Sequence, residues 1–310
     1  MCYRKRFSTI FSQAGEEEIK QALKRVNYYF KRKDFFDLND EDSNTLASLS
    51  CFNKSAYYYD IRSVLRYFPK EFKFKCLFGD IITVPDQPCF VKCRPIGENH
   101  ENSAILKLNQ VRHFREIKDP YLYQGKLDKL VWRGASYNIT RDTFVTNFIN
   151  NPFFDVGVTK GKSGFLGKEF QKPFLSISQQ LRYKFISSIE GNDVATNLKW
   201  IAQSNSLCFM HKPTHETWFM ENLLIPGIHY VEIPEDLSDL PKKMKYFISN
   251  SGEAKVIIKN FQEYYSKFLN IRNELLVALL VAVKYFFLSR QMSLEQLGLE
   301  SFTNCFLSDK

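Results

Sequence analysis

The sequence predicts an α/β protein, and the pattern of residues 183–233 is the main reason for that prediction. An apolar run rich in β-forming residues, Tyr183–Ile189, meets a turn at Gly191–Asp193. A helix extending to about Gln203 follows the turn, and it leads to a second short apolar strand, Ser206–Met210. Strand, glycine turn, helix and strand in this order is the alternation of a Rossmann-like unit.

The end of the same segment continues the pattern. We expect a helix that carries Glu216, Trp218 and Phe219, followed by a closing strand, Ile228–Ile233. In a sheet of this kind, ligands bind at the carboxyl ends of the strands, beside the N-termini of helices. A glycine after a strand lets the backbone approach a phosphate, and the next helix offers amide donors and a positive dipole end. The segment therefore predicts a site for a nucleotide diphosphate.

The N-terminal part of the chain predicts a first α/β unit that ends near Gly125. Apolar residues recur with helical spacing in Glu16–Lys33 and in Ala56–Phe68. Segments rich in turn-forming residues then separate three short strand candidates, which are Lys73–Phe78, Cys89–Cys93 and Ala104–Leu108.

A second unit opens with the strand Lys129–Trp132, and it continues with the helix Arg141–Asn150 and the strand Phe153–Val158. The loop Thr159–Gly167 is rich in Gly and Lys. The overlapping segment Gly157–Ser163 is not a phosphate-binding Walker loop, because three residues separate its glycines where that loop needs four. Three further helices are expected after residue 233, at Asp239–Asn250, Glu253–Phe268 and Arg272–Leu288.

Composition indicates a soluble globular protein with a basic surface. The 310 residues are 44% hydrophobic and 25% charged, with a net charge of +9. Basic clusters occur at Arg4–Arg6, Lys31–Lys33 and Lys242–Lys245. Such a surface favours phosphate-rich partners, among them anionic lipid headgroups and phosphorylated glycolipids. The sequence shows no nucleic-acid-binding signature, so we do not expect a nucleic-acid partner.

Cysteine usage and hydropathy indicate a cytoplasmic setting. The seven cysteines are scattered and contain no CxxC pair, so neither a zinc site nor a disulfide framework is predicted. The N-terminus lacks the apolar core of a signal peptide. The most apolar stretch, Leu275–Leu288, is too short to span a bilayer and contains Lys284. We expect it to be a buried or docking helix.

Several sequence blocks between Lys75 and Phe268 resemble, in order, those of glycosyltransferase family 90, and most closely its bacterial lipopolysaccharide-modifying branch. The blocks are Phe78-Gly79-Asp80, Val91–Ile96, Arg112-His113-Phe114, Trp132-Arg133-Gly134, Gly191–Asp193, Leu198–Trp200, Ser204-Asn205-Ser206, Glu216–Glu221, Pro226–Ile233 and Asp236–Leu240.

The resemblance implies a GT-B fold, in which two Rossmann-like domains face a cleft and a C-terminal helix returns to the first domain. The expected acceptor-side domain spans residues 1–127, and the nucleotide-sugar-binding domain spans 128–270. Residues 271–310 are expected to pack back on the first domain.

Two strand ends carry the predicted donor site. Arg133 follows a strand and can fork onto a diphosphate, although a surface arginine at a strand end is the alternative. The Gly191–Asp193 turn has only one carboxylate, so Asp193 is read as the N-cap of the next helix rather than as half of a metal-binding DxD. The predicted donor-binding residues are Arg133, Gly134, Gly191, Asn192, Asp193, Val194, Ala195, Thr196, Asn197, Lys199 and Glu216.

The resemblance also implies a departure from the animal members of the family. In those proteins an arginine that faces the diphosphate follows the matching turn, whereas this chain has Asn197 there, with Lys199 close by. Backbone amides of 194–196 are an alternative source of phosphate contacts. Glu216 is expected to hold ribose or sugar hydroxyls.

The predicted catalytic base is Asp80, which follows a strand through Gly79 and matches the base proposed for the family's protein O-glucosyltransferases. Inverting transfer needs a carboxylate to take the proton of the acceptor hydroxyl. A turn aspartate is the alternative reading, and Asp86 is a rival. The predicted acceptor- or phosphate-binding residues are Lys92, Arg94, Arg112 and His113, with solvated strand-end charges as the alternative. We expect neither a metal nor another cofactor.

The sequence thus predicts an inverting glycosyltransferase that moves a sugar from a UDP-sugar to a hydroxyl of the lipopolysaccharide core. It would act at the cytoplasmic face of the inner membrane, held peripherally on anionic lipid. Capsule polysaccharide or protein is an alternative acceptor. A non-catalytic basic module that docks on membranes is the alternative from another functional class.

Overall fold

The computed structural model describes residues 10–11, 14–38, 43–50, 55–97, 99–136, 138–159 and 166–308. The Arg4–Arg6 cluster, Cys2, Cys51 and the middle of the Gly- and Lys-rich loop (160–165) lie outside the described residues.

Backbone contacts divide the chain into two compact units. Unit 1 comprises 1–110, 216–218 and 268–310, and unit 2 comprises 111–215 and 219–267. Residues 111–127, assigned to the first domain in the sequence analysis, therefore belong to unit 2.

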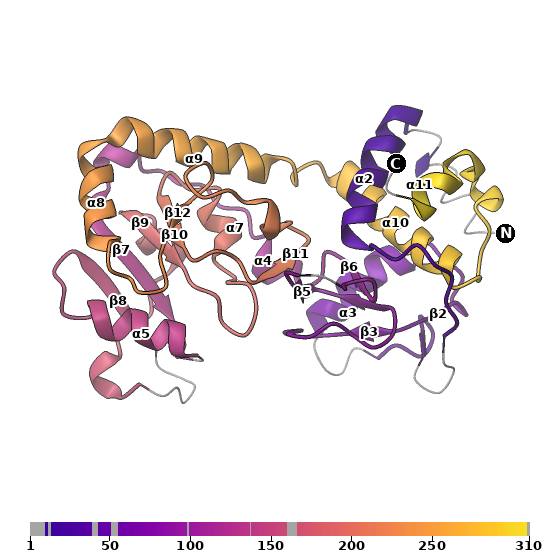
Figure 1. The fold of residues 1–310 in the computed structure, drawn as a ribbon, viewed down its shortest axis with the longest axis horizontal. Helices are drawn as coiled ribbons and strands as arrows, with labels where there is room; N and C mark the ends of the chain where they lie inside the picture. The colour runs from indigo at the N-terminus through magenta and orange to yellow at the C-terminus, as the bar shows by residue number, and fades with distance from the viewer. Residues whose placement is uncertain are drawn as a thin grey trace. The chain divides into compact units, whose positions relative to one another are not determined.

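Unit 2 is built on a five-stranded sheet whose neighbouring strands are parallel (Figure 1). Its strands are β7 (Leu127–Gly134), β8 (Phe154–Val158), β9 (Tyr183–Ser188), β10 (Leu207–Met210) and β12 (Val231–Glu232), in the order β12-β10-β9-β7-β8. The chain leaves β7 for β8 on one side and then crosses to β9 on the other. This reversal is a topological switch point, where the loops after β7 and β9 diverge. The predicted α/β class and parallel sheet are confirmed.

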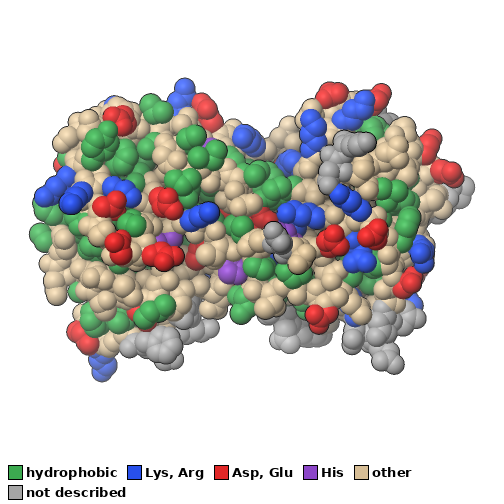
Figure 2. All heavy atoms as spheres, in the orientation of Figure 1, with side chains coloured by type: hydrophobic (Ala, Val, Ile, Leu, Met, Phe, Trp, Pro, Cys, Tyr) green, Lys and Arg blue, Asp and Glu red, His purple; other side chains and the backbone are tan. Residues whose placement is uncertain are grey.

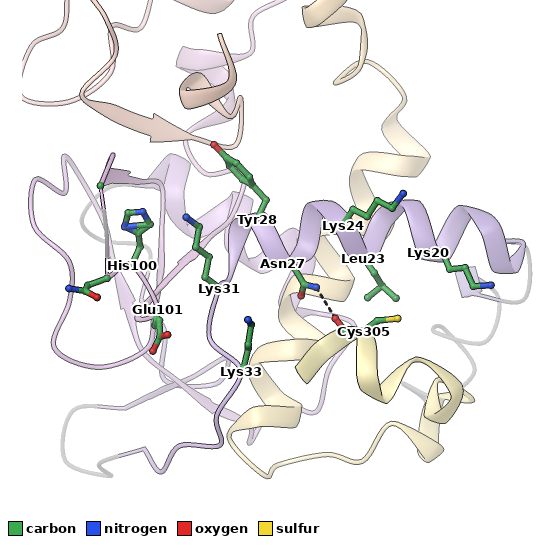
Figure 3. A pocket seen from close by; sticks show the side chains of 12 residues that line it. Lys20, Leu23, Lys24, Asn27, Tyr28, Lys31, Lys33, His100, Glu101 and Cys305 are labelled. Carbon is green, nitrogen blue, oxygen red and sulfur yellow. Dashed lines mark hydrogen bonds between the residues drawn. The ribbon is translucent and has the colours of Figure 1, made fainter. Parts of the chain in front are cut away.

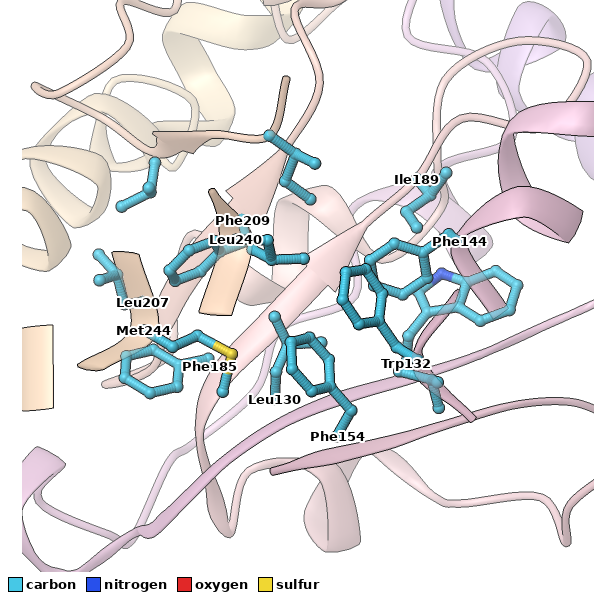
Figure 4. Packing of buried hydrophobic residues seen from close by; sticks show 14 of the residues in the cluster. Leu130, Trp132, Phe144, Phe154, Phe185, Ile189, Leu207, Phe209, Leu240 and Met244 are labelled. Carbon is cyan, nitrogen blue, oxygen red and sulfur yellow. The ribbon is translucent and has the colours of Figure 1, made fainter. Parts of the chain in front are cut away.

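The core of unit 2 combines aliphatic side chains with several aromatic rings that come from the strands and from α5 (Ile139–Phe148) (Figure 4). Phe148 and Phe154 stack with ring centroids 4.2 Å apart, and Trp132 meets Phe144 edge to face. A Cβ at Gly134 would lie 2.5 Å from Cζ2 of Trp132, so the glycine makes room for that indole ring.

Short and long helices complete unit 2. They are η2 (Tyr123–Gly125), η3 (Lys168–Phe170), α6 (Ile177–Gln180), α7 (Leu198–Ile201), η4 (Glu221–Leu223), α8 (Leu240–Ser249) and α9 (Ser251–Ser266). A proline at the start of α8 and the capping box at Ser176 of α6 explain where those two helices begin. The helix α4 (Gln110–His113) lies where the chain passes from unit 1 into unit 2.

Two local predictions in this region are wrong. The segment at Glu216 is a strand, β11 (His215–Thr217), which pairs with β5 (Cys93–Pro95). The helix after the glycine turn begins only at Leu198, so Asp193 is not its N-cap. In both places the local pattern suits a helix, but contacts with residues distant in sequence decide the conformation.

Unit 1 combines helices with small sheets. The helices are α2 (Glu16–Tyr29), α3 (Ser55–Leu65), α10 (Ile271–Leu288), η5 (Glu295–Leu297), η6 (Glu300–Phe302) and α11 (Thr303–Leu307). A parallel sheet joins β3 (Cys76–Leu77), β4 (Cys89–Val91) and β6 (Ser103–Ile105), and an antiparallel pair joins β1 (Asn44–Thr45) and β2 (Lys73–Phe74).

The apolar helix α10 packs against α2 and α3 within unit 1. Its Lys284 is 1% exposed and donates hydrogen bonds to Asn27 Oδ1 and to the carbonyl of Phe30. The expected buried helix is therefore confirmed. Among the described residues, no helix has the length and apolar character needed to cross a membrane. Figure 2 shows basic and acidic side chains interspersed over one face of the molecule.

Candidate functional site

A pocket of about 530 Å³ lies at the carboxyl edge of the parallel sheet of unit 2. The segments that follow β7, β9, β10 and β12 line it, together with the first turn of α5. Its polar lining consists of Asn138, Thr140, Thr143, Glu190, His211, Lys212, Thr214, Glu232 and Glu235. Of the predicted donor residues, only Gly191 lines this pocket. The position agrees with the rule that ligands bind at the switch point of an open parallel sheet.

Asn138 connects the two loops that diverge at the switch point. Its Oδ1 accepts a hydrogen bond from the backbone N–H of Arg141 and so caps the N-terminus of α5. Its Nδ2 donates to the carbonyl oxygens of Glu190 at 3.2 Å and Gly191 at 2.7 Å. One side chain therefore holds a helix N-terminus beside the turn after β9. That arrangement presents the positive end of a ten-residue helix to the pocket.

Arg141, about one turn further along α5, also connects the loop after β7 to the turn after β9. Its guanidinium donates to the carbonyls of Ala135, Ile189 and Glu190 at 2.8–3.1 Å, and it lies over the Trp132 ring. A Cβ at Gly191 would lie 3.1 Å from Nη2 of Arg141, so the glycine leaves space for the guanidinium. The glycine in the predicted turn thus has a packing reason as well as a position in the pocket.

Glu190 and His211 give the pocket its titratable groups. The Glu190 carboxylate accepts hydrogen bonds from the backbone N–H and the hydroxyl of Thr214, and so joins the segment after β9 to the segment after β10. Burial lowers the pKa of His211, against the opposing effects of a backbone hydrogen bond and of nearby glutamates. Within the described part of the chain, Nε2 of His211 is buried without a hydrogen-bond partner. His211 is itself one of the residues that line the pocket, next to Lys212.

The side chain of Arg133, a predicted phosphate ligand, makes its hydrogen bonds and its ion pair with other residues of unit 2. Its Nη2 lies 2.7 Å from Oδ1 of Asp155, and its other nitrogens donate to the carbonyls of Trp132, Asp155 and Pro173. The side chain is 5% exposed. The guanidinium therefore contacts protein acceptors, because a buried charge needs a partner and satisfied hydrogen bonds.

The remaining predicted donor-binding residues of unit 2 also do not line the pocket, apart from Gly191. Asn197 donates to the carbonyl of Ser187 and contacts the hydroxyl of Ser188, and Lys199 is fully buried against Glu221. Asn192 is exposed and Thr196 is half-buried, whereas Asp193, Val194 and Ala195 are buried.

Glu216 lies in unit 1 and not among the donor residues of unit 2. It forms a buried ion pair with Arg94, in which Nε and Nη2 each lie 2.8 Å from Oε1. Arg94 also donates to the carbonyls of Tyr28, Tyr29 and Ser103. Both side chains are at most 2% exposed, so this pair is part of the interior of unit 1.

The predicted base and the predicted cationic patch have different surroundings. Asp80 is 45% exposed, and its Oδ1 lies 3.1 Å from Nζ of Lys92, which is itself 3% exposed. Gly79, just before it, has φ 119°, a conformation that favours glycine. Arg112 is exposed, whereas His113 is buried, and both belong to unit 2. Lys92 and Arg94 are therefore buried ion-paired groups and not an exposed phosphate-binding surface.

Sequence reasoning missed the residues that organise the pocket, above all Asn138, Arg141, Glu190 and His211. One signal was present, because an asparagine placed just before a helix that follows a strand is a favoured N-cap. Among the described residues, no group of three or more His, Cys, Asp or Glu side chains is arranged to hold a metal ion.

Comparison with known proteins places this site in a wider context. A family model described as glycosyl transferase family 90 matches residues 107–275. The O-glucosyltransferase LpsA of Dichelobacter nodosus is 43% identical over 270 residues, which cover 87% of this chain and 84% of that protein. Protein O-glucosyltransferase 3 of Rattus norvegicus is 31% identical over 145 residues, which cover 44% of this chain and 28% of that protein. Protein O-glucosyltransferase 3 of Homo sapiens is 30% identical over the same length and with the same coverage.

Proposed function

This chain belongs to glycosyl transferase family 90 and is a glycosyltransferase, and from that premise we propose that it transfers glucose from UDP-glucose to a hydroxyl oxygen. The name of the bacterial relative, an O-glucosyltransferase, supports glucose and an oxygen acceptor. The proposal that the nucleotide of the donor is UDP rests on the family resemblance. The observation that carries the proposal is the pocket at the switch point of unit 2.

The proposed donor lies with its diphosphate at the N-terminus of α5. Amide groups of the first turn, beside Asn138, would bind phosphate oxygens, and the helix dipole favours their negative charge. Lys212 lines the same pocket and adds a positive charge. Carboxylates of Glu190, Glu232 and Glu235 suit hydroxyl groups of the ribose and the sugar, because an ionised carboxylate only accepts hydrogen bonds.

Departure of the nucleoside diphosphate is proposed to need no metal ion. The charge that develops on the leaving phosphate can be stabilised by the α5 N-terminus and by cationic side chains at the pocket. Arg141 contributes as a positioning residue, since its guanidinium holds the loops after β7 and β9.

Asp80 is the proposed base for an inverting transfer within a GT-B arrangement. Its carboxylate is nearly half exposed, so an acceptor hydroxyl can approach it. Nζ of Lys92 lies 3.1 Å from its Oδ1 and holds the side chain in place, and an ionised carboxylate is able to accept a proton. The step forms the new glycosidic bond at the anomeric carbon while the bond to the diphosphate breaks and the hydroxyl proton passes to the carboxylate.

The proposed acceptor is the core of lipopolysaccharide, reached by peripheral attachment to the cytoplasmic face of the inner membrane. The net charge of +9 favours association with anionic lipid. Capsule polysaccharide or protein is the alternative acceptor.

A donor screen tests the proposal. Purified protein would be incubated with UDP-glucose, other UDP-sugars and sugar nucleotides of other bases, and both nucleotide release and thermal stabilisation would be measured. At a hundred times its dissociation constant, the true donor should add roughly 2.7 kcal/mol to the free energy of unfolding. Release from another sugar nucleotide but not from UDP-glucose would contradict the proposed donor. A protein that no nucleotide stabilises would instead fit the membrane-docking alternative.

A further inference from the structure

Unit 1 contains a larger pocket, of about 1090 Å³, whose lining includes four lysines (Figure 3). Lys20 and Lys24 belong to α2, and Lys31 and Lys33 belong to the segment that continues from it. Among the described residues that line the pocket, the acidic side chain is Glu101. Lys20 also has an acidic neighbour on its own helix, because its Nζ lies 2.7 Å from Oε1 of Glu16. Positive charges outnumber negative ones around this cavity even when Glu16 is included, and such an excess attracts an anionic ligand.

The lysines are spaced for an extended ligand. Residues 20, 24 and 27 lie on one face of α2, because side chains three and four positions apart are neighbours on a helix. Lys20 and Asn27 are separated by about 10 Å along the helix axis, at 1.5 Å per residue. The chain then continues beyond the end of α2 at Tyr29 to Lys31 and Lys33. A ligand with anionic groups at several points along its length matches this row better than one compact ion does.

His100 supplies a second, independent indication of a ligand. Its side chain lines the pocket and is 4% exposed, and within the described residues its Nδ1 has no hydrogen-bond partner. Figure 3 shows it near Lys31. Burial, reinforced by the charges of Arg94 and Lys31, lowers the pKa of His100 to about 4, so the imidazole is neutral near pH 7. A buried polar atom without a partner is costly, and a ligand hydroxyl or phosphate oxygen would satisfy it.

We propose that this pocket binds a phosphate-bearing stretch of the glycan acceptor, with the lysines contacting phosphate groups and His100 contacting a polar group between them. The inference rests on the proposed function and adds an acceptor subsite to it. The sequence predicted that Lys92 and Arg94 bind the acceptor, but both are buried and ion-paired. The proposed acceptor subsite is instead the lysine-lined pocket of unit 1.

The shape and lining of the pocket favour a glycan over other anions. These lysines line a hollow of about 1090 Å³, which a glycan chain can enter, whereas a bilayer presents a flat surface. Single-stranded nucleic acid is normally held by exposed aromatic rings on which bases stack. Apart from the buried imidazole of His100, the aromatic ring in the described lining is that of Tyr28, whose hydroxyl donates to the carboxylate of Glu216.

The binding experiment compares two forms of one ligand. A lipid-free oligosaccharide that carries phosphate monoesters, and the same oligosaccharide after phosphatase treatment, would be titrated into the full chain by calorimetry. We expect Lys24→Gln/Lys31→Gln to weaken binding of the phosphorylated form roughly tenfold or more, since two charge–charge contacts are removed. The matched control is Lys255→Gln/Lys259→Gln, which removes two exposed lysines from α9 and should leave the affinity unchanged.

Two further readouts separate a binding role from a general effect of charge. The imidazole resonances of His100, assigned with His100→Gln, should move when the phosphorylated oligosaccharide is added. In transfer assays, the double variant should raise the KM for the phosphorylated acceptor rather than the KM for the donor.

Several outcomes would overturn the inference. These are equal binding of the two oligosaccharide forms, equal losses in the test and control variants, an unmoved His100 resonance, and a preference for phosphatidylglycerol vesicles or an oligonucleotide. The proposed function fails separately, because it predicts nucleotide release from a sugar donor. A chain that binds the phosphorylated oligosaccharide through these lysines but turns over no donor would retain this site and lose the proposed activity.

Discussion

Asn138 donates a 2.7 Å hydrogen bond from Nδ2 to the carbonyl oxygen of Gly191, and so joins the loop after β7 to the turn after β9. The same side chain caps α5. A single residue therefore controls both the position of a helix N-terminus and the shape of the neighbouring turn. If the donor diphosphate lies there, the residue should affect stability and nucleotide affinity together.

Replacing Asn138 with Ala should lower the free energy of unfolding by about 1 kcal/mol, the typical contribution of an N-cap. UDP affinity should fall as well, because the turn loses its connection to α5. Calorimetric titration and thermal unfolding measure the two effects. Asn147→Ala, at an exposed position of the same helix, is the control. An unchanged UDP affinity in Asn138→Ala would remove this end of α5 from the proposed donor site.

Replacing Asp80 with Asn should reduce turnover by roughly 10² to 10⁴ while donor affinity stays nearly unchanged. The substitution keeps the size of the side chain and removes the proton acceptor. Asp86→Asn is the control, because Asp86 lies in a turn whose carbonyls accept hydrogen bonds from Asn102. If Asp80→Asn retains more than about a tenth of wild-type turnover, the base is another group.

Arg133→Met should destabilise unit 2 in a pH-dependent way. Burial acts to raise the pKa of Asp155, but hydrogen bonds from Tyr183 and Arg133 outweigh burial and hold that pKa below its ordinary value. The resulting stability is present above the unfolded-state pKa, about 3.9, and is lost as the pH falls through the lower folded-state value. The variant should therefore unfold more readily at neutral pH and lose less of its stability on acidification.

Thermal unfolding between neutral and acidic pH measures this effect of Arg133. A separate titration with UDP checks the earlier prediction from the sequence. If Arg133 binds the diphosphate, the variant should lose about 1.5–3 kcal/mol of nucleotide affinity. Because Arg133 is paired with Asp155, we expect Arg133→Met to lower the stability of unit 2 and to leave the affinity for UDP unchanged.

Breaking the buried pair of Arg94 and Glu216 should be strongly destabilising. Glu216→Gln leaves a buried guanidinium without its counter-charge, and a loss of about 3–5 kcal/mol is expected. Denaturant unfolding measures it. Lys259→Gln, which breaks an exposed pair with Glu263, should change stability by less than about 1 kcal/mol. A small effect in Glu216→Gln would show that the pair is not a structural element of unit 1.

Transfer should continue after removal of divalent cations. The proposed stabilisation of the leaving diphosphate comes from the α5 N-terminus and from cationic side chains. Nucleotide release and product formation would be measured with and without EDTA. Loss of activity that manganese or magnesium restores would show that a metal ion is required.

Local patterns in the sequence were enough to predict the parallel sheet and most long helices. The strands β9 and β10 are short apolar runs bounded by turn residues, and α2 and α10 show clear helical patterns or continuous apolarity. The Gly191 turn was placed correctly because glycine after a strand has a recognisable backbone use. These elements depend on residues close together in the chain.

The surroundings of Glu216, Arg133 and Lys199 differ from those predicted, because each side chain pairs with a residue that is not its neighbour in sequence. Glu216 lies in a segment with a helix-like pattern, but its ion pair with Arg94 joins residues 122 positions apart. Arg133 and Lys199 look like free cations next to a phosphate site, yet Asp155 and Glu221 neutralise them. A sequence pattern shows that a charge is present, whereas the fold decides which opposite charge it meets.

The division of the chain between the two units has a consequence for its synthesis. Unit 1 takes residues from the beginning, the middle and the end of the chain, since 216–218 and 268–310 belong to it. Arg25 and Glu274, which form an ion pair inside it, are 249 positions apart. Residues 268–310 must therefore be translated before unit 1 can close, whereas all of unit 2 has by then been translated. Until then α2 lacks the packing that α10 provides, and apolar surface exposed in this way makes an incompletely folded chain prone to aggregation.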